Sequence, residues 1–120
     1  MKIAVTSSGT DLDAEVDPRF GRCTNFIFVD TDTDEVEVAA NEGMMAAGGA
    51  GIQSAQIVAD KGATVVLTGN CGPNAYRTLE AAGVKVIIGV AGTVREAVDK
   101  YKAGELSATE GPNVGAKFGV

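Results

Sequence analysis

Histidine is absent from the 120-residue sequence. Serine and cysteine hydrolases use histidine as their general base, and many zinc sites use it as a ligand. Its absence excludes Ser-His-Asp and Cys-His catalysis and any histidine-ligated zinc site. An enzyme built on this chain would have to take its general base from the carboxylates of Asp11, Asp13 and Asp17.

Basic residues are also scarce. Ten Lys and Arg stand against sixteen Asp and Glu, which gives a formal net charge of -6. Nucleic acids and anionic membranes both require a basic surface, so we expect neither as a partner. The apolar run at 2–6 is too short for a signal peptide or a spanning helix, and we therefore expect a cytoplasmic protein.

The sequence has only two cysteines, Cys23 and Cys71, and no CxxC pair. In a cytoplasmic protein we expect free thiols or metal ligands rather than a disulfide. A lone cysteine is often a small buried apolar residue. A thiol at a helix N-terminus instead has a lowered pKa, which we expect for Cys71, and Arg19 and Arg22 favour the same shift at Cys23. Two thiolates could hold a soft metal or an iron–sulfur fragment.

The order of apolar runs and helical patterns predicts an α/β fold. The chain is long enough for a single hydrophobic core. Helices are expected at 52–62, 75–83 and 93–104, the last begun by a Thr93–Glu96 capping box. Strands are expected at 2–6, 25–30, 35–40, 63–68 and 84–90. This β-β-β-α-β-α-β-α order predicts a five-stranded mixed sheet flanked by helices, with the first and the two late strands parallel neighbours.

Two further expectations concern the edges of this domain. The alternation in 35–40 predicts a half-buried strand, with Val36, Val38 and Ala40 on one face and Glu35, Glu37 and Ala39 on the other. Residues 1–104 form one domain, and the glycine-rich residues 105–120 form a partly ordered tail. An uncovered sheet edge is compatible with a monomer or a homodimer.

The stretch 68–75 (TGNCGPNA) joins a predicted strand to a predicted helix. Pro73 suits the first helical turn, Gly72 permits close backbone approach, and the N–H groups of a helix start favour an anion. Ligands of open α/β sheets bind beyond the carboxyl ends of the parallel strands. Those ends are expected at Ser7–Gly9, 69–72 and 90–92, so the turn is predicted to lie in a ligand-binding crevice.

Two other segments belong to this argument. Segment 17–23 (DPRFGRC) carries Arg19 and Arg22, which could neutralise an anionic ligand or form surface salt bridges with the acidic loop 11–17. The cluster Gly48–Gly51 is either a flexible loop or a near match to a dinucleotide fingerprint, with Ser54 in place of the third glycine. Its position remains open: the opposite edge of the sheet, or beside the turn if the preceding loop folds over.

Three motifs, 17–23 (DPRFGRC), 48–53 (GGAGIQ) and 68–75 (TGNCGPNA), occur in an order that resembles the dinitrogenase iron–molybdenum cofactor biosynthesis family. Its members include NifX-type carriers and the C-terminal domain of NifB-type proteins. The resemblance spans Met1 to about Tyr101. It implies a ribonuclease H-like fold without nuclease activity, since strand 3–5 lacks the carboxylate that a two-metal nuclease needs.

The resemblance also implies a function, which is to bind an iron–sulfur, molybdenum–iron–sulfur or molybdenum–copper–sulfur cluster and to deliver it between donor and acceptor proteins, without catalysis. The histidines suspected as ligands in some members are missing here, so either thiols replace them or charge and backbone N–H groups hold the cluster. The predicted metal ligands are Cys23 and Cys71. The predicted cofactor-binding residues are Arg19, Phe20, Gly21, Arg22, Gly48, Gly49, Gly51, Asn70, Gly72, Pro73 and Asn74. The alternatives are a nucleotide- or phosphate-binding enzyme and a regulatory or assembly module that carries no cluster.

Overall fold

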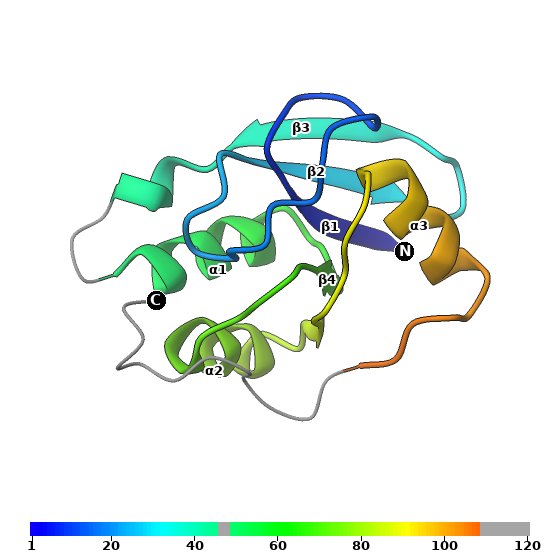
Figure 1. Cartoon of the computed structure of the whole chain (residues 1–120). Coiled ribbons are helices and arrows are strands. Elements are labelled where there is room, and N and C mark those ends of the chain that lie inside the picture. Colours follow the sequence, from blue (N-terminus) through cyan, green and yellow to red (C-terminus); the bar gives the residue numbers. More distant parts are fainter. Residues whose placement is uncertain (46–48, 109–120) are drawn as a thin grey trace.

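A computed structural model describes residues 1–45 and 49–108 (Figure 1). Its elements follow the predicted order. The strands are β1 (Lys2–Ser7), β2 (Asn25–Asp30), β3 (Val36–Ala40), β4 (Val65–Leu67) and β5 (Lys85–Ile87). The helices are the 3₁₀-helix η1 (Glu42–Met45) and the α-helices α1 (Ala50–Asp60), α2 (Pro73–Ala81) and α3 (Val94–Lys102). None of the described helices has the length and apolarity needed to cross a bilayer.

The five strands form one mixed sheet in the order β3-β2-β1-β4-β5. β2 is antiparallel to both β1 and β3, whereas β4 is parallel to both β1 and β5. The predicted five-stranded mixed sheet, with the first and two late strands as parallel neighbours, is therefore confirmed. The ribonuclease H-like designation stays a prediction implied by the resemblance.

Helices cover both faces of the sheet, which explains why its central strands are apolar throughout. Helices α1 and α2 bury one face, including Ala4, Phe28 and Val66, and α3 buries the other, including Ile3 and Val5 (Figure 1). Each successive residue of a strand faces the opposite side, so β1 supplies side chains to both halves of the core.

The prediction that β3 is half-buried is wrong, because all of its residues except Ala39 are exposed. Val36 and Val38 are 44% and 39% exposed, and Ala40 is also exposed. β3 is an edge strand, and α3 packs on β1 instead of covering this face. Ala39, on the opposite face, packs against the core beneath α1. A sequence alternation identifies two faces of a strand but does not identify the face that a helix covers.

Helices α1 and α2 also begin earlier than predicted, and the late strands are shorter. α1 begins at Ala50, and α2 begins at Pro73 with Gly72 as its N-cap. The dihedral angle φ that proline imposes suits the first helical position, so Pro73 lies inside α2. The capping box of Thr93 and Glu96 at the start of α3 is confirmed. The last part of the predicted tail, 109–120, lies outside the described residues.

Candidate functional site

The carboxyl ends of β1 and β4 are joined by buried hydroxyl groups. Thr6 donates its Oγ1 hydrogen to the carbonyl of Asp17 at 2.7 Å, and its Oγ1 lies 2.9 Å from that of Thr68. The backbone N–H of Asp17 donates in return to the carbonyl of Thr6 at 2.9 Å. These bonds fix the start of segment 17–23 at the sheet edge where a ligand was predicted.

Segment 17–23 then crosses the turn that follows β4. The Asn70 side chain donates from Nδ2 to the carbonyl of Pro18 at 2.9 Å, and the Asn70 carbonyl accepts from the N–H of Phe20 at 3.1 Å. A Cβ atom at Gly69 would lie 2.7 Å from Cα of Pro18. The glycine is therefore needed for the close approach of two backbones.

The start of α1 completes this group of segments. A Cβ atom at Gly21 would lie 2.9 Å from backbone atoms of Gly51, and one at Gly51 would lie 3.1 Å from Cβ of Ala75 in α2. α1 runs antiparallel to the strand that it precedes, so its start lies at the carboxyl end of β4. This settles the open position of the glycine cluster in favour of the turn. Gly48 lies outside the described residues.

The three α-helix starts differ in how their N–H groups are satisfied. At α3, Thr93 and Glu96 form the capping box, and the carbonyls of Leu12 and Ala14 accept from the following N–H groups. At α1 and α2 the N-caps are Gly49 and Gly72, and neither start has a side-chain cap among the described residues. A helix start without a side-chain cap, together with the positive end of the helix dipole, favours an anion at the α1 and α2 starts.

Two arginines lie on the segment that adjoins these helix starts. The Arg19 side chain is 63% exposed, and its Nε lies 3.5 Å from Oδ1 of the buried Asp17 carboxylate. Arg22 is also exposed. Phe20, between them, is buried with its ring 5.7 Å from that of Phe26. Segment 17–23 thus presents its arginines outward and anchors itself in the core through an aromatic ring.

The predicted low pKa values of the thiols are wrong. Cys23 and Cys71 are 0% and 1% exposed and lie in the core cluster beneath α1 and α2. Burial raises the pKa of Cys71 to about 12. Burial and then the Asp17 charge raise the pKa of Cys23 to about 12, against a hydrogen bond from Asn41. Loss of solvent thus outweighs any helix-terminus or arginine effect on either thiol.

The described part of the chain does not bring together a conventional metal site of three or more ligands. Among the described residues, no group of three or more Cys, Asp or Glu side chains could hold a metal ion. The predicted ligands Cys23 and Cys71 keep their sulfur atoms inside the core, whereas Gly49, Gly51, Asn70, Gly72 and Pro73 are partly exposed and Asn74 is exposed. This arrangement suits an anion held from outside by N–H groups and guanidinium groups.

Sequence reasoning missed a buried polar network beneath this surface. Asn41 is 2% exposed and Ser54 is buried, and the two side chains bond to each other at 3.0 Å. Both also bond to the carbonyl of Gly21. The available signal was a serine beside the apolar face of a predicted helix, at the position where a glycine fingerprint fails.

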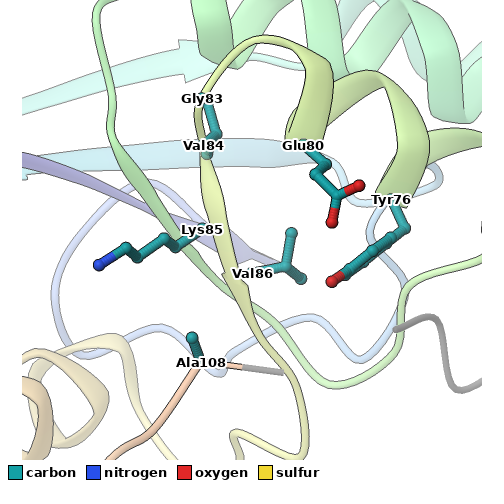
Figure 2. Close-up of a pocket in the computed structure, with 7 residues that line it drawn as sticks. All are labelled: Tyr76, Glu80, Gly83, Val84, Lys85, Val86 and Ala108. Atoms are coloured by element: carbon teal, nitrogen blue, oxygen red, sulfur yellow. The ribbon is translucent and has the colours of Figure 1, made fainter. Parts of the chain in front are cut away.

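A cavity of about 280 Å³ lies elsewhere, beside the end of α2 and the start of β5 (Figure 2). It contains none of the predicted site residues. The cavity is lined by Tyr76, Glu80, Gly83, Val84, Lys85, Val86 and Ala108. The Glu80 carboxylate and the negative end of the α2 dipole disfavour an anion there.

Comparison with known proteins places the chain in a family. Residues 1–104 match the family described as dinitrogenase iron-molybdenum cofactor. The apo form of the orange protein from Desulfovibrio gigas is 44% identical, with a TM-score of 0.92 over 94% of this chain and 96% of that one. A putative NifB protein from Thermotoga is 40% identical, with a TM-score of 0.79 over 89% of this chain and 91% of that one.

A more distant relative agrees over nearly its whole length. An uncharacterized protein of Methanocaldococcus jannaschii is 28% identical over 113 residues, which are 92% of each chain. The family match covers all three motifs on which the resemblance rested, 17–23, 48–53 and 68–75. This chain therefore belongs to the dinitrogenase iron-molybdenum cofactor family.

Proposed function

We propose that this protein binds an anionic metal–sulfur cluster as cargo and passes it on during metallocofactor assembly. The observation that carries the proposal is the meeting of the α1 and α2 starts, both without a side-chain cap in the described structure, beside the arginines of segment 17–23. Two exposed arginines lie together here on a chain of net charge -6. Family membership supports the same chemistry.

The cargo is held by hydrogen bonds and charge, not by thiolates. Both thiols lie inside the core, at 0% and 1% exposure, and are therefore turned away from the surface that carries the helix starts and the arginines. Sulfide at the surface of an anionic cluster accepts hydrogen bonds from N–H donors, and arginines neutralise its charge. The residues assigned to this site are Arg19, Gly21, Arg22, Gly49, Gly51, Asn70, Gly72, Pro73 and Asn74.

A binding protein fits this site better than an enzyme. The carboxylates that could act as a general base are already engaged: Asp17 is buried beside Arg19, Asp11 accepts from the N–H of Asp13, and Asp13 accepts from Nε of Arg95 at 3.2 Å. We assign the protein the role of a carrier between a donor and an acceptor of the cluster. Exposed Val36 and Val38 on the edge strand β3 offer a surface for such proteins or for a second copy.

The test is anaerobic purification after growth with iron, molybdate and copper, followed by an ultraviolet–visible spectrum and elemental analysis. A carrier is expected to be coloured and to contain metal, or to become loaded on mixing with a charged donor protein. Protein without metal in both cases would contradict the proposal and favour an assembly module. Calorimetry with a panel of nucleotides tests the alternative of a nucleotide-binding enzyme. Saturable binding of a nucleotide would favour that enzyme and contradict a carrier.

A further inference from the structure

The buried Asn41 side chain holds the backbone of segment 17–23 from below. Asn41 directly follows β3 and is 2% exposed. Its Nδ2 group donates to the carbonyl of Cys23 at 3.0 Å and to that of Gly21 at 3.3 Å. The same group lies 3.6 Å from the Cys23 sulfur. One amide therefore contacts the chain on both sides of Arg22.

The orientation of this amide is set by its other end. Asn41 Oδ1 accepts from the backbone N–H of Gly43 at 3.1 Å and bonds to Ser54 Oγ at 3.0 Å. A backbone N–H can only donate, so it identifies the oxygen end of the amide and leaves the nitrogen end for Gly21 and Cys23. The Asn41 and Ser54 side chains are themselves buried, and hydrogen bonds in such surroundings are strong and costly to break.

Asn70 makes a matching arrangement around the other arginine. Its Nδ2 group donates to the carbonyl of Pro18 at 2.9 Å, and its carbonyl accepts from the N–H of Phe20 at 3.1 Å. Pro18 and Phe20 flank Arg19. Two asparagines, one after β3 and one after β4, thus each fix the backbone on both sides of one exposed arginine.

We infer that Asn41 is a positioning residue that presets Arg22 for the cargo, as Asn70 presets Arg19. The inference rests on the proposed function only for what the arginines bind. The hydrogen bonds that Asn41 and Asn70 make on both sides of each arginine are features of the fold. Holding the backbone in advance leaves only the side chain to be ordered on binding, which lowers the entropic cost. Asn41 acts through Arg22 and does not touch the cargo.

Trypsin tests these asparagine hydrogen bonds without any ligand, because it cleaves after arginine and requires the chain at the cleaved bond to unfold locally. Asn41→Ala is expected to raise the initial rate of cleavage after Arg22 about tenfold relative to cleavage after Arg19, measured by mass spectrometry. Asn70→Ala is expected to shift the ratio the opposite way. Global destabilisation would expose both bonds alike, so the ratio separates positioning from stability. An unchanged ratio in Asn41→Ala overturns the inference.

Binding of tetrathiomolybdate, a simple molybdenum–sulfur anion, tests the consequence. Asn41→Ala is expected to weaken binding about tenfold in the wild-type and Arg19→Ala backgrounds but to have no added effect in Arg22→Ala. An equal loss in both arginine backgrounds would make Asn41 merely structural and overturn the inference. If the wild-type protein binds no thiometalate, the proposed function fails, and the cleavage ratio alone decides whether Asn41 positions Arg22.

Discussion

Cys23 and Cys71 show how burial decides the chemistry of a residue. Both stand beside groups that lower a thiol pKa, namely the start of α2 for Cys71 and two arginines for Cys23. Both nevertheless have pKa values of about 12, because burial removes the solvent that stabilises a thiolate. The sequence shows which residues adjoin a cysteine along the chain but not how far its side chain is exposed to solvent. The raised pKa values of the two thiols could therefore not be predicted.

The raised thiol pKa values predict a loss of stability at high pH. Above the ordinary value of 9.0 the unfolded thiols release protons, whereas the folded thiols keep theirs up to about 12. The unfolded state then binds fewer protons, and the free energy of unfolding falls by up to about 1.4 kcal/mol per pH unit for each thiol.

This pH dependence is measured by urea unfolding between pH 8 and 10.5. The control is Cys23→Ala/Cys71→Ala, which lacks both groups and is expected to show a shallower fall. Equal slopes in the two proteins would mean that the thiols titrate normally in the folded state and are open to solvent.

Asn41 marks a second limit at the scale of single residues. An asparagine after a strand is an ordinary loop residue in sequence, and only the folded chain brings it within 3.3 Å of the Gly21 carbonyl. Pro73, by contrast, could be placed from sequence, because the rule that puts proline in the first turn of a helix is local.

At the scale of elements, local rules succeeded where the interaction is local. The capping box of α3 and its buried Val94, Ala97 and Val98 follow from spacing within one helix. The convergence of the α1 start with segment 17–23 depends on contacts between Gly21 and Gly51, thirty positions apart, and was left open. The uncovered face of β3 was missed for the same reason.

The contact between segment 17–23 and α1 predicts a large cost for Gly21→Ala. Its new Cβ would lie 2.9 Å from backbone atoms of Gly51, which cannot move aside as a flexible side chain does. We expect a loss of about 1–3 kcal/mol in the free energy of unfolding by urea, together with weaker thiometalate binding.

The matched control is Gly49→Ala. A Cβ at Gly49 has no neighbour within 4 Å in the described structure, so only the N-cap preference changes. That change costs about 1 kcal/mol or less. A Gly21→Ala variant no less stable than Gly49→Ala would contradict the close approach.

The capping box of α3 predicts a change in stability without a change in binding. Thr93→Ala removes the hydroxyl that accepts the Glu96 N–H and is expected to cost about 1 kcal/mol by thermal or urea unfolding. The α3 start is closed by the carbonyls of Leu12 and Ala14, so it takes no part in the proposed site. Weakened thiometalate binding beyond the stability loss would show that the site extends to α3.

At the scale of the whole molecule, the sheet topology followed from two general rules. The tight link between β2 and β3 makes them antiparallel, and the crossovers through α1 and α2 make β1, β4 and β5 parallel. The position of the site at the carboxyl ends of the parallel strands follows in turn. Which part of this edge is open to a ligand was not predictable. Loop 11–17 covers the start of α3 through hydrogen bonds between residues far apart in sequence.

The contrast between an acidic molecule and its arginine segment predicts a strong salt dependence. Because Arg19 and Arg22 are exposed, their attraction for an anion is screened as the Debye length falls from about 10 Å at 0.1 M salt to about 3 Å at 1 M. The thiometalate dissociation constant is expected to rise severalfold over this range in wild type and much less in Arg19→Ala/Arg22→Ala. Arg95→Ala, on α3, is the control and should retain the wild-type slope.

The central claim is that the cargo is held by helix starts and arginines, and not by thiolates. The most direct measurement is the metal content of three proteins expressed and purified anaerobically side by side: wild type, Cys23→Ala/Cys71→Ala and Arg19→Ala/Arg22→Ala. We predict that the cysteine variant keeps the wild-type ratio of metal to protein and that the arginine variant loses most of its metal. A metal-free cysteine variant beside a fully loaded arginine variant would contradict the account.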